Sequence, residues 1–479
     1  MSKDQIVGFL SEFIKIQSVS TDKKRFLEIK KAVAFLSRFL SKLGFSVNIL
    51  EKENTPPLIL ASLIKDKNAK TIGIYGHYDV QPEDPVAEWE TPPFSLTLKN
   101  GKFFGRGVAD NKGHIIQNLV AIQRLIETKK LKNNIVFILE GEEETGSVNF
   151  EDYVKKVKNI LSKVDVFYLI DTGMHKKNMP QIFYGLRGII YFELTVKIGE
   201  RDLHSGVYGN RVYNPINVLA DLIAKIKDIK TGKILIPRFY DQVRKIPKDE
   251  LLPLKKTIKS NEEEKNEAGV FGLFNNEFDF CFSFIPGLTR NPVDSRFRGN
   301  DINNKDKSII RIMNLNSLSS KILPSFDCHG IISGFVGEGQ KTVIPKEAKV
   351  KFSFRLVEHQ DPKEIESLVF DFVKKNLPKE VKWELKCLSK SAPFYTDFNN
   401  QWVKQTAKIL KEVFGNAVIF NRTGGSIPAA EILQRLYKKP IILTGFTLPD
   451  DNIHAPNENF DEKMFFLGIE ALEKIYECW

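Results

Sequence analysis

The sequence predicts an α/β fold in two domains: a larger one built on a mainly parallel sheet, and a smaller α+β domain inserted into it. Between residues 71 and 171, short apolar runs alternate with segments of helical periodicity, which is typical of a parallel sheet covered by helices on both faces. From Gly185 the pattern changes to strands of alternating polarity, and the first pattern returns near residue 391. We therefore place the larger domain at 1–184 and 391–479, and the inserted domain at 185–390.

Apolar residues spaced three and four apart predict the helices, and short apolar runs predict the strands. In the larger domain we expect helices at 4–16, 25–43, 114–128, 401–414 and 462–479. Strands are expected there at 46–50, 58–63, 71–75, 134–139, 164–170, 417–420 and 441–443, with a further element at 424–434. In the inserted domain, strands at 189–198 and 342–356 are each followed by a helix, at 215–229 and 363–376.

One segment of the inserted domain fits neither pattern. Residues from about 271 to 313 are rich in Asn, Arg, Asp, Phe and Pro and have no clear period. Residues 285–292 (IPGLTRNP) have the composition of turns, not of a buried core. We expect a surface insertion that is mobile or partly disordered.

Composition excludes several classes of protein. With 42% hydrophobic and 27% charged residues, the 479-residue chain is typical of a globular protein, and it has no apolar stretch near the roughly 20 residues that span a bilayer. The N-terminal residues lack the apolar core of a signal peptide, so we expect a cytoplasmic protein. The net charge is +11, but the lysines are scattered and not clustered with aromatic residues, which argues against nucleic-acid binding. Four widely spaced cysteines predict neither a disulfide framework nor a zinc knuckle.

Acidic residues and histidines follow the ends of several predicted strands. His77 and Asp79 come after the strand at 71–75, Glu143 and Glu144 after 134–139, and Asp171 after 164–170. Taken alone, each has a plain alternative, because the first pair could cap a strand and the glutamates could form a solvated acidic turn or begin a helix. Together they are expected to meet at one sheet edge, where open α/β sheets bind ligands.

Asp110 and His454 extend this set from two loops, although His454 alone could be an ordinary loop histidine. Two imidazoles and three or four carboxylates suit a pair of divalent ions, zinc first, with manganese or cobalt as alternatives. One carboxylate must then bridge the ions, and another must stay unligated to act as a base. We choose Asp110 for the bridge and Glu143 for the base.

Four motifs in order resemble the M20 metallopeptidases. They are GHYDVQP at 76–82, GRGVADNKG at 105–113, EGEEETGS at 140–147 and DLHSG at 202–206. With KTVIP at 341–345, the sequence is most similar to the branch of non-specific dipeptidases and carnosinases. The resemblance covers nearly the whole chain and implies a zinc-peptidase-like catalytic domain with an inserted domain that serves as lid and dimerisation surface.

The resemblance also implies a role for each site residue. His77, Asp110 and Asp171 would hold one metal ion, and Asp110, Glu144 and His454 the other. Glu143 would be the general base and then the acid, Asp79 would orient His77, and the peptide bond from Asp110 to Asn111 would be cis. His204 would act across a homodimer in the active site of the second subunit, stabilising the oxyanion. The substrate would be bound by His204, Thr342, Arg355 and Ser426.

The function implied is hydrolysis of the amide bond of dipeptides or short peptides by a metal-activated bridging water, with Glu143 as general base. Two alternatives stay open. One is an N-acyl amino acid deacylase of the same family. The other is a non-catalytic metal-binding relative, if the insertion blocks closure of the lid. His114, His175, His329 and His359 match no ligand position of the family, and we expect them to be structural.

Overall fold

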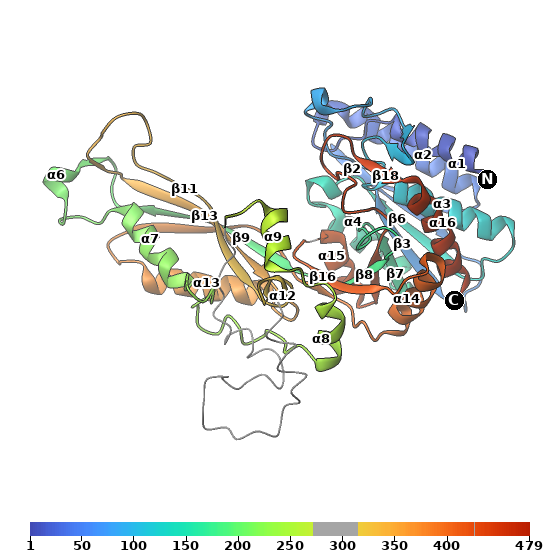
Figure 1. The fold of residues 1–479 in the computed structure, drawn as a ribbon. Coiled ribbons are helices and arrows are strands. Elements are labelled where there is room, and N and C mark those ends of the chain that lie inside the picture. The colour runs from blue at the N-terminus through green and yellow to red at the C-terminus, as the bar shows by residue number, and fades with distance from the viewer. Residues whose placement is uncertain (272–314, 426) are drawn as a thin grey trace, which may run out of the picture. The chain divides into compact units, whose positions relative to one another are not determined.

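The structure is a computed structural model that describes residues 1–271, 315–425 and 427–479 (Figure 1). The chain divides into two compact units, of which the first comprises Met1–Tyr184, Thr396–Asn421 and Ile427–Trp479. The second comprises Gly185–Tyr395 and Arg422–Ser426. Apart from Phe271, the insertion predicted at about 271–313 lies outside the described residues.

A large mixed sheet forms the framework of the first unit. Its strands lie in the order β1 (Ser46–Lys52), β2 (Thr55–Leu63), β6 (Asn134–Glu140), β3 (Thr71–His77), β7 (Val166–Ile170), β17 (Ile441–Thr444) and β8 (Gln181–Leu186). The four central strands, from β6 to β17, are parallel, and antiparallel pairs flank them. Two short strands, β15 (Phe394–Tyr395) and β16 (Ile419–Thr423), pair with β8 and complete a sheet of nine.

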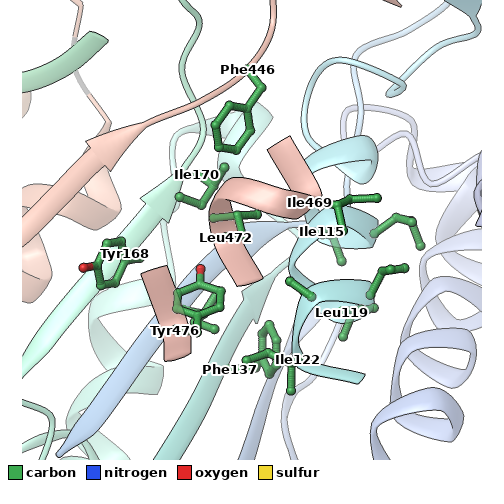
Figure 2. Packing of buried hydrophobic residues seen from close by; sticks show 14 of the residues in the cluster. Ile115, Leu119, Ile122, Phe137, Tyr168, Ile170, Phe446, Ile469, Leu472 and Tyr476 are labelled. Carbon is green, nitrogen blue, oxygen red and sulfur yellow. The ribbon is translucent and has the colours of Figure 1, made fainter. Parts of the chain in front are cut away.

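The central strands are buried because helices cover both faces of the sheet. Every residue of β3 and β6 is buried, as expected for parallel strands inside an α/β layer. The main helices are α1 (Lys3–Ile14), α2 (Phe26–Lys42), α3 (Lys112–Glu127), α14 (Gln401–Phe414) and α16 (Glu462–Glu477). Figure 2 shows Ile115 of α3 beside Ile469 of α16, both within the main hydrophobic core.

Smaller elements complete the first unit. Its short helices are η1 (Lys23–Arg25), η2 (Val86–Glu88), η3 (Glu143–Thr145), α4 (Phe150–Lys156), α5 (Lys158–Leu161) and α15 (Pro428–Tyr437). A separate sheet joins β18 (Asn459–Asp461), β5 (Lys102–Phe104) and β4 (Thr97–Lys99). Because β18 pairs with β5, this small sheet brings the segment before α16 next to the segment before α3.

The second unit is an α+β layer on a four-stranded antiparallel sheet. Its order is β11 (Ser325–Ser333), β13 (Glu347–Leu356), β9 (Gly188–Lys197) and β14 (Lys382–Ser391). Alternate residues of β9 are buried, and they share a core with α7 (Pro215–Ile226) and α13 (Pro362–Asn376). The remaining elements are β10 (Leu203–His204), α6 (Ser205–Tyr208), α8 (Lys248–Lys255), α9 (Asn261–Ala268), α12 (Leu315–Ile322) and β12 (Val343–Ile344).

The predicted fold class, a mainly parallel α/β layer with an inserted α+β layer, is confirmed. The alternating stretch predicted at 342–356 proves to be two strands, β12 and β13, because Pro345 between them has no N–H for a sheet ladder. The element at 424–434 is a helix that begins only at Pro428, since two glycines precede it. None of the helices in the described ranges is long and apolar enough to cross a bilayer.

Candidate metal centre

Three neighbouring parallel strands deliver most of the predicted ligands to one sheet edge. β3 lies between β6 and β7, so the carboxyl ends of all three strands meet. β3 ends at His77, β7 is followed directly by Asp171, and β6 is followed by the turn that carries Glu143 and Glu144. This edge is where open α/β sheets place their ligands.

Asp110 lies between the two histidines of the set. One of its carboxylate oxygens, Oδ1, is 2.9 Å from His77 Nε2. The other, Oδ2, is 2.9 Å from His454 Nε2. The peptide bond between Asp110 and Asn111 is cis, as the family resemblance implied. A carboxylate whose two oxygens face two different imidazoles has the arrangement expected of a bridging ligand.

Each histidine has a second carboxylate beside the same nitrogen. Asp171 Oδ1 is 3.4 Å from His77 Nε2, and Glu144 Oε2 is 3.2 Å from His454 Nε2. The side chains therefore form two groups of three that share Asp110. Ligand atoms of His77, Asp110 and Glu144 all lie within 4.8 Å of one another, so a single ion can be reached from both groups.

Asp79 lies behind His77 and is fully buried. His77 Nδ1 is 3.1 Å from the Asp79 carbonyl oxygen and 3.4 Å from Asp79 Oδ1, so both oxygens are placed to accept a proton from Nδ1, which favours the tautomer that presents Nε2 to a bound cation. The Asp79 carboxylate also accepts hydrogen bonds from the backbone N–H groups of Glu143 (3.3 Å) and Glu144 (3.1 Å). One side chain thus fixes both the ring of His77 and the turn that follows β6.

The electrostatics of the centre fit bound cations. Burial raises the pKa of Glu143 to about 9, with the charges of Asp171 and Asp110 acting in the same direction. Burial likewise raises the pKa of Asp171 to about 6. Hydrogen bonds to Asp110 and Glu144 raise the pKa of the His454 imidazole to about 10. The two histidines lower the pKa of Asp110, whereas the proton held by His454 and the effect of the Asp171 and Asp110 charges on Glu143 indicate an excess of negative charge.

The donor atoms of the centre also suit divalent ions. Glu144 Oε1 is buried and has no hydrogen-bond partner. In the part of the chain that the structure describes, the ion pairs of Asp110, Glu144 and Asp171 are all with the two histidines, and no lysine or arginine neutralises them. Imidazole nitrogens and carboxylate oxygens at this spacing are the ligands of zinc and similar ions.

The Glu143 carboxylate, by contrast, makes no ion pair or hydrogen bond to any described residue, although its backbone is fixed by Asp79. It lies close enough to the centre for the charges of His77, Asp171 and Asp110 to influence its pKa. Of the predicted acidic residues, Asp79 and Glu143 stay outside the two groups of three, and of these two only the Glu143 carboxylate lacks a partner among the described residues. Its position is compatible with the unligated base predicted from the sequence.

Three residues that were not predicted organise the centre. Asn111 Nδ2 donates to Asp171 Oδ1 (2.7 Å) and to the Ile170 carbonyl oxygen (2.8 Å). Glu458 accepts hydrogen bonds from the backbone of the Asp110 loop and forms a buried ion pair of 2.8 Å with Arg106. Arg106 and Asn111 stand inside a quoted motif, but nothing in the sequence indicates which groups they contact.

The other predicted site residues belong to the second unit. His204 and Thr342 are exposed, on neighbouring segments joined by the pairing of His204 with Val343, and Arg355 lies in β13. Ser426 lies outside the described residues. Their roles toward the metal centre therefore stay predictions. Of the histidines expected to be structural, His114 is buried and accepts a hydrogen bond from the Phe446 N–H (3.1 Å).

Comparison with known proteins points to one family. The model of peptidase family M20/M25/M40 matches residues 73–477. Human Beta-Ala-His dipeptidase is 30% identical, over 99% of this chain and 90% of the relative. The Cys-Gly metallodipeptidase dug1 of Schizosaccharomyces pombe is 31% identical, over 98% of this chain and 94% of the relative.

A solved structure agrees with these relatives. The M20 family metallo-carboxypeptidase Sso-CP2 from Sulfolobus solfataricus matches with a TM-score of 0.77 and 30% identity, covering 100% of this chain and 99% of that one. The predicted resemblance to the M20 metallopeptidases, and to their dipeptidase branch, is therefore confirmed. A match over most of the chain, together with a histidine and carboxylate centre at the sheet edge, shows that the chain belongs to peptidase family M20/M25/M40.

Proposed function

We propose that this metallopeptidase hydrolyses the amide bond of dipeptides or short peptides that end in a free carboxylate. The observation that carries the proposal is the position of Asp110, whose two oxygens each lie 2.9 Å from a different histidine. The names of the similar proteins, a Beta-Ala-His dipeptidase and a Cys-Gly metallodipeptidase, support a dipeptide substrate.

The two groups of three side chains would each hold one divalent ion. We assign His77, Asp110 and Asp171 to the first ion, and Asp110, Glu144 and His454 to the second. Zinc is our first choice, with manganese or cobalt as alternatives, because the donors are imidazole nitrogens and carboxylate oxygens. When bound, such ions supply Lewis acidity that polarises the scissile carbonyl and lowers the pKa of water.

Glu143 would move the proton. Its carboxylate has no partner among the described residues, and the charge of bound cations would oppose the burial and the acidic neighbours that raise its pKa. With the cations bound, Glu143 would be available to accept a proton from the attacking water and then to pass it to the leaving amine. Asp79 would hold this residue in place through the Glu143 N–H, and it would keep His77 in the tautomer that presents Nε2. A single buried carboxylate would thereby align both the base and a ligand.

The remaining roles follow the family resemblance. His204 would stabilise the oxyanion in the active site of the second subunit of a homodimer, and Thr342, Arg355 and Ser426 would contact the substrate. The second unit would then serve as lid and dimerisation domain. We also propose that the protein works in the cytoplasm.

The test is a substrate panel on the purified full chain, loaded in parallel with zinc, manganese or cobalt. We expect release of free amino acids from dipeptides, and loss of that activity in Glu143→Gln at unchanged metal content. Turnover of N-acetylated amino acids without turnover of dipeptides would show the deacylase instead. Two bound ions with no turnover of either class would indicate the non-catalytic relative. Light scattering on the same sample tests the homodimer.

A further inference from the structure

Two arginines share one face of the sheet in the second unit. Arg355 of β13 pairs with Ile189 of β9 on one side and with Ser325 of β11 on the other. Directly paired residues point to the same face, and Arg187, which lies just before β9, reaches that face because its guanidinium donates to Ser325, the residue paired with Arg355. The opposite face, with Ile190 and its neighbours, packs into the hydrophobic core under α7 and α13. The arginines therefore lie on the side that no helix of this core covers.

The guanidinium of Arg187 has few partners although it is largely enclosed. Its Nη1 donates to Ser325 Oγ over 3.4 Å, and its Nε is buried without a hydrogen-bond partner in the part of the chain that the structure describes. Burial, followed by the repulsion of Arg355, lowers the pKa of Arg187 to about 10, while Asp327 opposes this shift. A buried guanidinium without a hydrogen-bonded carboxylate is costly, because all five of its N–H groups require acceptors.

The acidic side chain whose charge acts on Arg187 does not supply those acceptors. Asp327 is 59% exposed, accepts a hydrogen bond from Ser325 Oγ (3.3 Å) and lies 3.8 Å from Lys227 Nζ. Arg355 for its part makes no ion pair or side-chain hydrogen bond with any residue in the described ranges. Within the described residues, two neighbouring cations thus share a site that lacks a matching anion.

A glycine pair closes one side of this site and leaves the other open. The Arg187 N–H donates to the Thr423 carbonyl oxygen (3.3 Å), which holds the 423–425 turn against the arginine. A Cβ atom added at Gly424 would lie 2.6 Å from Arg187 Nη2, whereas one added at Gly425 would meet nothing within 4 Å. The backbone at Gly424 therefore lies so close to the guanidinium that a side chain would not fit there. At Gly425 the neighbouring space is open.

We propose that Arg187 acts together with Arg355 as a two-arginine receptor for the terminal carboxylate of the substrate, which makes Arg187 a specificity-determining residue. A carboxylate has two oxygens with about four lone-pair positions, enough to serve both guanidinium groups through paired N–H···O bonds. The receptor rests on the proposed function, since it selects peptides with a free carboxyl end. It also extends that function, because a peptide amide has no negative charge to pair with the two guanidinium groups, so the site would select against it.

The experiment compares a dipeptide with its C-terminal amide, using the metal-loaded full chain and three variants. Arg187→Met removes the charge at similar length, and Arg187→Lys keeps the charge without the fork. Arg238→Met is the matched control, because Arg238 is a surface arginine of the same unit, 65% exposed and paired with Asp241 and Glu364. Circular dichroism and thermal unfolding check that each variant folds.

We expect Arg187→Met to raise KM for the free dipeptide by about 10- to 100-fold, the range expected for a lost charge-assisted hydrogen bond, with a smaller effect on kcat. Catalysis on the amide should stay nearly unchanged, so the preference for the free acid collapses. Arg187→Lys should give an intermediate loss, and Arg238→Met none. Equal losses on acid and amide, or an unchanged preference, would overturn the proposal.

A binding measurement separates this proposal from the proposed function. Calorimetry with a dipeptide analogue in which CH2–NH replaces the scissile amide does not require turnover. The hydrolase proposal fails if the unmodified chain hydrolyses no dipeptide. The receptor still stands in that case if the chain binds the analogue and Arg187→Met weakens this binding by about 10-fold or more, while binding of the analogue's C-terminal amide changes less. Equal binding of the acid by the variant and the unmodified chain refutes the receptor whatever the catalytic result.

Discussion

Replacement of Glu458 by glutamine should loosen the metal centre without removing a ligand. The Glu458 carboxylate is 1% exposed and accepts four hydrogen bonds, three of them from the backbone N–H groups of Gly107 (2.9 Å), Ala109 (2.8 Å) and Asp110 (3.1 Å). The fourth comes from Arg106 Nη1 (2.8 Å), whose Nη2 also donates to the Ala455 carbonyl oxygen over 3.3 Å. The pair therefore ties the loop of Asp110 to the loop of His454.

The size of the effect follows from these contacts. In Glu458→Gln one oxygen becomes an NH2 group, which faces either two backbone donors or Gly107 and Arg106, so two acceptors are lost in either orientation. Each unsatisfied buried donor costs about 1–3 kcal/mol, and the loss of one partner of a buried ion pair costs about 3–5 kcal/mol. These costs overlap, and we expect the free energy of unfolding to fall by about 3–5 kcal/mol in total. At roughly 2–4 °C per kcal/mol, Tm falls by at least about 6 °C.

Calorimetric metal titration and thermal unfolding of the same sample measure both consequences. Because the loops of Asp110 and His454 lose their common anchor, metal affinity should fall by about 10- to 100-fold, the usual effect of removing a group that orients a ligand. Glu470→Gln on α16 is the control, since that side chain is 50% exposed and its one ion pair among the described residues is with Lys474, a contact worth less than about 1 kcal/mol. If Glu458→Gln binds both ions as tightly as the unmodified chain and melts within about 2 °C of it, the anchoring role is refuted.

Three further substitutions test other parts of the site and of the fold. Asp79→Asn should weaken metal binding by about 10- to 100-fold, and less than His77→Ala, because it disturbs the tautomer of His77 but keeps the ring; equal losses in a metal titration would contradict this. Glu143→Gln should lower kcat by about 10²- to 10⁴-fold at unchanged metal content, and an unchanged rate would remove Glu143 from the role of base. Gly445→Ala should lower stability by about 1–3 kcal/mol or more, because its Cβ would lie 1.5 Å from the Thr172 carbonyl oxygen. Its counterpart Gly8→Ala, with nothing within 4 Å inside α1, should raise stability by about 0.5–1 kcal/mol, so the opposite order of Tm values would contradict the packing argument.

The places of the proposed ligands that follow strands could be predicted from the sequence because strand ends obey a simple rule. His77 and Asp171 follow apolar runs that proved to be adjacent parallel strands, and carboxyl ends of such strands must meet. Alternation of polarity likewise predicted β9, whose buried and half-buried residues alternate along its whole length. In both cases a short local pattern was enough: the end of an apolar run placed the polar residues at the sheet edge, and alternation of polarity assigned side chains to one face of the sheet or the other.

The contacts that orient those ligands leave no comparable pattern. Arg106 and Glu458 are 352 residues apart, and their pairing depends on where two irregular loops meet. Arg187 likewise could not be singled out from the sequence, because its proposed role depends on a buried Nε without a partner among the described residues, which only the structure shows. Strand β14 was missed for a related reason, because it lies at the edge of its sheet and half or more of its residues are exposed.

The metal centre therefore combines two kinds of support. His77 and Asp171 adjoin strands with no exposed residue, where movement would disrupt the main core, so their separation is fixed by the packing of the sheet. Asp110 and His454 come from loops, and only buried polar contacts such as those of Glu458 hold them in register with the strands. Because Asp110 belongs to both groups of proposed ligands, a displacement of its loop would disturb both groups. Three backbone N–H groups that set the position of Asp110 need acceptors, and an apolar side chain could satisfy none of them. The cost of burying the charge of Glu458 is thus offset by the hydrogen bonds that its carboxylate accepts.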